Sequence, residues 1–447
     1  VDKLPLPVLT RWLGRRRAWL LLSQIMIAVA IIMMAMVDPA TNTLTLMAVA
    51  AVLLGFSSAT QDIVIDAYRI ESAESDLQAL MSSTYIAGYR IGMLLAGAGA
   101  LFLASYFGST SDSYSYQAWQ TSYFIMASLM LIGIVTTFIV DEPNSQFEKV
   151  LHNYQEYLGL LGVFIISVAA FIATYWFIGG FFIYSVWEAM LPNGLGKLID
   201  SHIGGFVLEI LRLFVAIIAA GIVAKAISLT NIVKQELLIE SYIDPVRDFF
   251  QRYGWSLAWL LLALIGLYRI SDIVLGVISN VFYQDLGFTK IEIATVVKSF
   301  GLAMTIAGGF LGGLLAVRFG VMRILFLGAL LSALTNLLFM ILAQMGHDMT
   351  MLYIVISADN LSAGLASAAF IAFLSSLTNI SFTAVQYALF SSLMTLLPKV
   401  LGGYSGTMVD TLGYQQFFFI TALMGVPVLI LILVAAKRFT LHELKIK

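Results

Sequence analysis

Two carboxylates and a guanidinium lie one helical turn apart in the stretch from Gln61 to Arg69. Asp62 and Asp66 are four residues apart, and Asp66 and Arg69 are three apart, so a helix places all three on one face. Two carboxylates on one face can share or relay a proton, and a neighbouring cation can hold one of them ionised. The pattern favours either a proton-coupling site or a structural charge lock that pairs with Arg90 or with a basic loop.

Further charged residues fall inside long apolar segments, where a charge near the bilayer centre costs at least about 2.5 kcal/mol. Arg90 and Lys399 are cations in mid-segment, which suit either an anionic substrate or neutralisation of the nearby carboxylates. Arg269 and Asp272 are three residues apart. They are expected either to neutralise each other or to face the first cluster across a central cavity. Asp359-Asn360 is a candidate for lining the substrate path.

Other charged or small residues in these segments are predicted to be structural. Glu209 and Arg212 are expected to form a local ion pair. The glycine pattern of residues 308–313 predicts close helix approach, because small residues four apart let two helices meet. A solvated cytoplasmic loop is expected to contain Glu71, Glu74 and Asp76.

The composition sets the elements that must carry these residues. The chain has 447 residues, of which 60% are hydrophobic and 11% are charged, against about a quarter charged in soluble domains. Apolar runs longer than about 18 residues predict membrane-spanning helices, and the runs lack the two-residue alternation of a membrane barrel. There is no cysteine, no H-E-x-x-H and no G-x-x-x-x-G-K-[ST] motif. We therefore expect a transporter, not an enzyme, with no cofactor, no metal and no nucleic-acid partner.

The apolar runs predict twelve spanning segments. Their expected limits are residues 18–37, 44–68, 80–107, 119–140, 158–187, 204–224, 256–282, 292–317, 323–344, 350–378, 383–409 and 414–437. If the basic stretch of residues 11–17 is cytoplasmic, most Lys and Arg in the loops also fall on the cytoplasmic side. The positive-inside rule then predicts that both ends of the chain are cytoplasmic.

The chain also repeats itself with an offset of about 306 to 309 residues. Gly55, Ser58 and Ala59 match positions 364, 367 and 368, and Ala79-Leu80 matches positions 388–389. On this register Arg90 falls on Lys399. Duplicated bundles of this kind are typical of transporters with the binding site between the halves.

The repeat further predicts an unequal division of the chain. The second half has two helices before its basic loop that the first half lacks, which suggests an N-terminal truncation. We therefore expect an incomplete first bundle over residues 1–141, cytoplasmic linkers and an inserted helix pair over 142–255, and a six-helix bundle over 256–447.

Several stretches resemble the AmpG-type muropeptide permeases of the major facilitator superfamily. The most specific stretch, Ser57 to Arg69, resembles the signature of the fourth helix of that family. Agreement extends to nearly the whole chain outside about 145–240. The other matching stretches are Asp2-Lys3 with Gly14–Trp19, Gly88–Met93, Tyr268–Asp272, Lys298, Asp359–Leu361 and Phe382–Leu389.

The resemblance implies roles for individual residues. It implies proton coupling at Asp62, Asp66 and Arg69. It implies substrate binding by Gln61, Tyr89, Arg90, Arg269, Asp272, Asp359, Asn360, Gln386 and Lys399. It implies a gating loop that contains Asp2, Lys3, Arg15, Arg16 and Arg17.

The resemblance also implies an activity and a location. The expected activity is proton-coupled import of anhydro-muropeptides for peptidoglycan recycling, by a monomer in the bacterial inner membrane. Two alternatives remain open at this point. The acetyl-coenzyme A transporters share the Gln-Asp of the fourth helix and also carry a large anion, and a truncated permease would be inactive.

Overall fold

The protein is helical wherever the structure describes it. The computed structural model describes residues 6, 8–41, 44–74, 77–109, 113–143, 154–179, 202–230 and 234–446. Every regular element in those ranges is a helix, and twelve helical stretches are long and apolar enough to cross a bilayer. The predicted all-α membrane fold with twelve spans is therefore confirmed, whereas Asp2, Lys3 and Asp76 lie outside the described residues.

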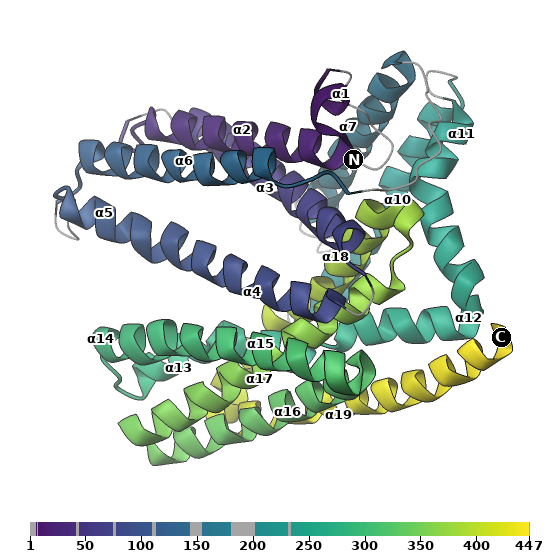
Figure 1. Ribbon diagram of the computed structural model, residues 1–447. Coiled ribbons are helices and arrows are strands. Elements are labelled where there is room, and N and C mark those ends of the chain that lie inside the picture. The colour runs from purple at the N-terminus through teal and green to yellow at the C-terminus, as the bar shows by residue number, and fades with distance from the viewer. Residues whose placement is uncertain are drawn as a thin grey trace, which may run out of the picture. The chain divides into compact units, whose positions relative to one another are not determined.

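The chain divides into two compact units, and the first contains residues 1–147, 291–332 and 350–391. Its first helices are α1 (Leu9–Leu13), α2 (Arg15–Ala35), α3 (Leu44–Ser72), α4 (Gln78–Leu94), α5 (Ala100–Tyr106) and α6 (Tyr116–Ile139). Helix α2 packs along both α3 and α6 (Figure 1). Helix α6 begins where the Ser115 side chain accepts a hydrogen bond from the Ala118 N–H, which satisfies one of the unpaired donors of the first turn.

The same unit contains helices from late in the sequence. They are α14 (Lys290–Glu292), α15 (Gly301–Phe319), α17 (Met349–Leu377) and the first part of both α16 (Val321–Met345) and α18 (Thr383–Gly402). Glycines of α15 lie against two partners. A Cβ on Gly308 would come within 2.1 Å of the Leu361 carbonyl oxygen of α17, and one on Gly313 within 2.0 Å of the Ser83 Oγ of α4. The predicted close approach at residues 308–313 is confirmed.

The second unit contains residues 148–290, 333–349 and 392–447. Its helices are α7 (Tyr154–Phe177), α10 (His202–Ser228), α11 (Gln235–Leu238), α12 (Asp244–Leu267), α13 (Ile270–Asp285) and α19 (Ser405–Ile446), with the later parts of α16 and α18. Helices α7 and α10, the predicted inserted pair, pack against each other. Helix α19 packs along α12 and α13, where Phe282, Phe339 and Phe418 form a buried aromatic cluster.

Two of the predicted segments differ from the helices observed. The segment predicted at 256–282 is divided at Tyr268-Arg269 into the end of α12 and α13. The segment predicted at 383–409 ends at Gly402, and α19 begins at Ser405. Helix α19 is itself kinked at Gly413, whose φ of 78° interrupts the helical conformation. Glycines adjacent to apolar runs therefore set boundaries that hydrophobicity alone does not indicate.

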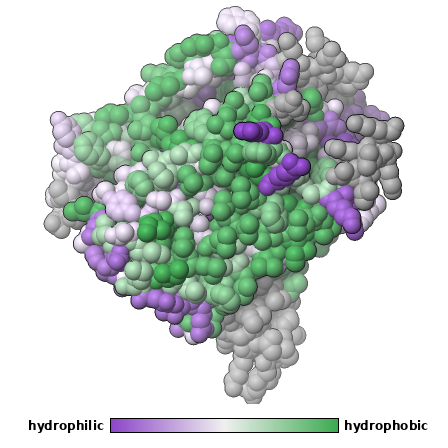
Figure 2. All heavy atoms as spheres, turned by 60° about the horizontal axis from the view of Figure 1, so that its bottom comes forward, coloured by the Kyte–Doolittle hydropathy of each residue, from purple (hydrophilic) through white to green (hydrophobic). Residues whose placement is uncertain are grey.

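Apolar side chains also cover the outside of the helices. Val52 is 72% exposed and Ile132 is 67% exposed, although both lie in the middle of spanning helices. Figure 2 shows one face of the molecule on which hydrophobic residues predominate and hydrophilic residues are few. Exposed apolar surface of this extent indicates contact with lipid instead of water.

Candidate functional site

Arg69 is the centre of a buried polar network in the first unit. The residue is 3% exposed. One terminal nitrogen of its guanidinium donates to the Ser375 Oγ at 3.0 Å. The other donates to the Gln78 Oε1 at 3.4 Å and to the Ser82 Oγ at 3.3 Å. The cation is therefore held largely by neutral acceptors from two other helices, α4 and α17.

Asp66 is the charged partner of Arg69. It is 5% exposed, and its Oδ1 lies 3.6 Å from the Arg69 guanidinium. This oxygen has no hydrogen-bond partner among the described residues. A buried carboxyl group that is neutralised by one cation, and is not saturated with donors, is a place where binding of a proton changes the charge of the whole network.

Asp62 lies in different surroundings, although it was predicted to share a face with Asp66. It is exposed and accepts a hydrogen bond from the Tyr85 hydroxyl at 3.1 Å. The rings of Tyr85 and Tyr387 lie 5.7 and 5.5 Å from the Arg69 guanidinium carbon. These distances allow cation–π attraction, which adds to the hydrogen bonds that fix Arg69.

Four helix ends bring this network together. Asp66 and Arg69 lie near the C-terminus of α3, and Ser375 lies near the C-terminus of α17. Gln78 begins α4, and Tyr387 lies in the first turns of α18. A cation at the C-terminus of a helix is favoured by the helix dipole. The network is thus located at the end of these helices and not at their midpoints.

A second set of ion pairs in the same unit involves Arg15, Arg16 and Arg17, which lie in the first turn of α2 and not in the loop that was predicted to contain them. Arg16 is fully buried, and its Nε donates to the Glu71 Oε2 at 3.0 Å. Arg15 lies 3.5 Å from the same carboxylate. The side chain of Glu71 is only 1% exposed, so the prediction that it lies in a solvated loop is wrong. Burial follows because the guanidiniums of Arg15 and Arg16, in the first turn of α2, replace water around the carboxylate.

Glu142 completes this second set of contacts and was not singled out from the sequence. Its carboxylate accepts hydrogen bonds from the backbone N–H groups of Arg16 at 2.8 Å and Arg17 at 3.0 Å. The Arg17 side chain donates to the carbonyl oxygens of Thr137 and Phe138. The first turn of α2 is therefore tied to the ends of α3 and α6.

The other predicted site residues of the first unit are in mixed environments. Asn360 accepts a hydrogen bond from the Thr305 Oγ1 at 2.9 Å, while Gln386 is buried and accepts one from the Asn379 N–H at 2.8 Å. Tyr89 is 57% exposed and stacks on Tyr85. Half-buried positions are occupied by Gln61, Arg90 and Asp359. The side chains of Gln386 and Asn360 thus have hydrogen-bond partners within the protein, whereas the ring of Tyr89 is largely exposed.

In the second unit the predicted pairs are formed. Arg269, the residue that precedes α13, forms an ion pair with Asp272 in the first turn of that helix. Glu209 and Arg212 pair within α10, and Glu209 also accepts a hydrogen bond from the Tyr175 hydroxyl of α7 at 2.7 Å. Helices α7 and α10 are thus joined by a polar contact as well as by packing. Lys399 is exposed.

The comparisons with known proteins match nearly the whole chain. The family model described as Major Facilitator Superfamily matches residues 4–239. The putative transporter AmpG 4 of Rickettsia conorii is 28% identical over 433 residues, which cover 97% of this chain and 82% of that relative. The anhydromuropeptide permease of Escherichia coli K12 is 27% identical over 422 residues, which cover 94% of this chain and 66% of that relative. The resemblance predicted from the sequence is confirmed by these relatives.

Solved structures agree on the fold. The proton:xylose symporter XylE superposes with a TM-score of 0.57 at 12% identity, covering 94% of this chain and 80% of that chain. The human organic anion transporter MFSD10 superposes with a TM-score of 0.52 at 12% identity, covering 93% of this chain and 77% of that chain. At such identities the likeness concerns the arrangement of helices alone.

Proposed function

The chain belongs to the major facilitator superfamily, and on that premise we propose that it imports anhydro-muropeptides together with protons. The observation that carries the substrate is the similarity to a relative named anhydromuropeptide permease, which extends over 94% of this chain. A transporter of this superfamily needs no active site for bond chemistry, so the task of the polar residues is to bind, to release and to couple.

In this proposal Asp66 is the group that takes up the proton. It is buried, it lies beside Arg69, and its Oδ1 lacks a hydrogen bond among the described residues. Protonation would neutralise the one carboxylate that pairs with Arg69 among the described residues, leaving the guanidinium with the neutral acceptors of α4 and α17. A change of one charge in a buried network shifts the balance between two conformations of the bundle.

The substrate would be held by groups that complement its chemistry. An anhydro-muropeptide carries sugar rings and peptide carboxylates. Arg90 supplies a cation for these carboxylates, because a guanidinium group binds a carboxylate in a two-point geometry. The exposed ring of Tyr89 supplies an apolar face for a sugar.

Uptake into cells tests both parts of the proposal. Cells that lack their own permease would be given labelled anhydro-muropeptide, with and without a protonophore. We expect accumulation only in cells that make the chain, and we expect the protonophore to abolish it. An Arg69→Ala variant, checked for insertion into the membrane, serves as the inactive control.

The possible results separate the substrate from the coupling. Absence of uptake by an inserted chain would overturn the muropeptide assignment. Uptake that the protonophore leaves unchanged would overturn proton coupling and leave the substrate in place.

A further inference from the structure

A small pocket lined by aromatic rings lies in the first unit, at the end of α3 remote from Arg69. Its volume is about 200 Å³. It is formed by the end of α2, the residues that follow it, the start of α3 and the start of α6. The lining residues are Met34, Ala35, Val37, Pro39, Met47, Tyr114, Tyr116, Trp119, Gln120 and Tyr123.

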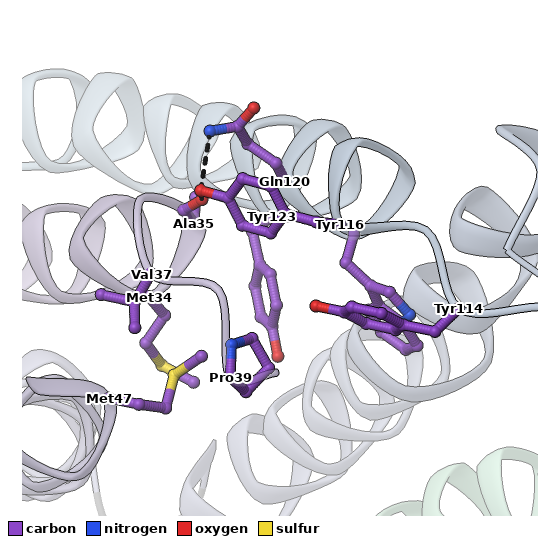
Figure 3. Close-up of a pocket in the computed structure, with 10 residues that line it drawn as sticks. Met34, Ala35, Val37, Pro39, Met47, Tyr114, Tyr116, Gln120 and Tyr123 are labelled. Atoms are coloured by element: carbon purple, nitrogen blue, oxygen red, sulfur yellow. Dashed lines mark hydrogen bonds between the residues drawn. The ribbon is translucent and has the colours of Figure 1, made fainter. Parts of the chain in front are cut away.

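The rings are oriented toward the hollow. Figure 3 shows Tyr114 and Tyr123 reaching toward the space beside Pro39, with Met34 and Met47 on the other side. The hydroxyl of Tyr123 has no hydrogen-bond partner within the described part of the chain. The pocket therefore combines apolar walls with a polar group that is available to a ligand.

Hydrogen bonds hold the walls in place. The Tyr116 hydroxyl donates to the Ala35 carbonyl oxygen at 3.0 Å and accepts from the Gln120 Nε2 at 3.0 Å. The Tyr114 hydroxyl donates to the Asp38 Oδ1 at 2.9 Å. Rings fixed in this way lose little conformational freedom when a ligand binds, which favours binding.

The pocket differs from the belt of Tyr and Trp that membrane proteins place at the lipid interface. Belt residues expose their rings, as Tyr106 does on α5 with 74% of its surface exposed. Tyr116, Trp119 and Tyr123 are instead half-buried around a cavity. Anchoring in the interface thus accounts for Tyr106 and for the ring of Tyr114, which is 49% exposed at the rim, but it leaves the three half-buried rings unexplained.

The chemistry of the lining selects a neutral amphipathic ring. A pyranose presents C–H groups on its faces, which pack on aromatic rings, and hydroxyl groups at its edge, which bond to polar tips such as those of Tyr and Gln. The ionised group next to the pocket is Asp38, whose carboxylate is held by Tyr114 and by the Ala40 N–H. A negative charge at the rim disfavours carboxylates and phosphates.

We propose that this pocket binds one pyranose ring, the sugar end of the muropeptide. This inference rests on the proposed function for the identity of the sugar. Helix α3 runs from Leu44 to Ser72, and its pocket-lining residue Met47 is 22 residues from Arg69, so the pocket and the Arg69 network are about 33 Å apart along it. The pocket acts as a first contact at the surface opposite the network, and it retains the disaccharide before the peptide reaches the cations of the transport path.

Binding and import measured side by side test the proposal. The full-length chain in nanodiscs would be titrated with labelled N-acetylglucosamine disaccharide, and import would be measured in cells. We expect Tyr123→Ala and Tyr114→Ala each to weaken binding about three- to tenfold, the range for loss of one aromatic contact. The KM for import should rise in proportion while kcat stays unchanged.

Two further variants sharpen the result. Tyr123→Phe keeps the ring and removes the hydroxyl, so it should have an effect smaller than that of Tyr123→Ala. Tyr106→Ala removes an exposed ring outside the pocket and should bind and import like the wild type. A thermal unfolding temperature equal to that of the wild type shows that a variant is folded. A Tyr→Ala variant that fails this test is replaced by the Tyr→Phe variant at the same position.

The outcomes distinguish the pocket from the transport function. If the wild type imports muropeptide but the pocket variants bind sugar and import like it, the pocket proposal is overturned alone. The proposal would also be overturned if the protein binds no sugar and the stability of the pocket variants changes with lipid composition. If the wild type binds the disaccharide through Tyr114 and Tyr123 but imports nothing, the pocket stands and the proposed function falls.

Discussion

Arg69 and Asp66 form an ion pair that the fold has removed from water. Both residues are at most 5% exposed, and taking two charges out of water costs several kcal/mol per ion before their attraction is counted. Ser375, Gln78 and Ser82 offset part of this cost because they accept hydrogen bonds from the guanidinium. A pair that is retained at such cost in a membrane protein is expected to serve transport and not stability alone.

Substitution of the two aspartates separates the buried carboxyl from the exposed one. We expect Asp66→Asn to lower protonophore-sensitive uptake about 5- to 150-fold, the range of typical coupling free energies. Asp62→Asn should retain most of the uptake, because Asp62 is exposed and its recorded partner is the Tyr85 hydroxyl. Initial uptake rates across pH 5 to 8 measure the effect. Normal transport by both variants at every pH would remove the coupling role from this cluster.

Ser375 tests whether the hydrogen bond between α3 and α17 stabilises the fold. Ser375→Ala removes an acceptor 3.0 Å from a charged donor, and we expect a loss of about 1.5–3 kcal/mol in the free energy of unfolding. The control is Ser376→Ala, since the Ser376 hydroxyl donates only to the Phe373 carbonyl of its own helix. Unfolding by detergent titration measures both variants, and equal losses would argue against the interhelical bond.

At the scale of the element, the internal repeat explains which residues surround Arg69. Residues that match in the repeat are 309 apart in this region. Ser375 is the counterpart of Asp66, and Tyr387 is the counterpart of Gln78, and all four lie around Arg69. Equivalent positions of the two repeats thus meet at one cation, because equivalent helices have ends on the same side of the bundle.

The glycines of α15 give a prediction about helix packing. A Cβ on Gly308 would lie 2.1 Å from the Leu361 carbonyl oxygen, so Gly308→Ala must separate α15 from α17. We expect a loss of about 1–3 kcal/mol in the free energy of unfolding, as for other overpacked sites.

Gly92→Ala is the matched control for that substitution. Gly92 lies in α4, and a Cβ there would meet nothing within 4 Å. Alanine is the better helix former, so this variant should gain about 0.5–1 kcal/mol. Thermal unfolding of the purified variants compares the two, and equal behaviour would show that the close approach is not needed.

At the scale of the whole molecule, both ends of α3 carry functional proposals. The aromatic pocket lies at one end and the Arg69 network at the other. The distribution of Lys and Arg predicts that the network faces the cytoplasm and the pocket faces the periplasm. This orientation is required if the pocket is to meet the substrate before import.

The absence of cysteine makes the orientation directly measurable. The wild-type chain contains no cysteine, so it serves as the blank for single-cysteine variants. We expect Ser113→Cys to react with a membrane-impermeant maleimide in intact cells, and Thr230→Cys to react only after lysis. The reverse pattern would invert the predicted topology and place the pocket in the cytoplasm.

The properties that depend on neighbours along the chain could be predicted from the amino-acid sequence. Twelve spans follow from apolar length, because the bilayer demands about 20 apolar residues per helix. The pairing of Asp66 with Arg69 and of Glu209 with Arg212 follows from helical spacing. The superfamily could be recognised because local motifs of this kind occur along the chain in a characteristic order.

Which distant residues meet, and which charges are buried, depended instead on how the helices pack against one another. It placed Ser375 on Arg69, buried Glu71 against Arg16, and left Asp62 exposed one turn from a buried Asp66. It also brought the end of α2 and the start of α3 against the rings of residues 114–123 to form the aromatic pocket. Helical periodicity fixes the face on which a side chain lies, but burial depends on what packs against that face, and these neighbours are distant along the chain, 55 residues for Arg16 and Glu71 and 306 for Arg69 and Ser375.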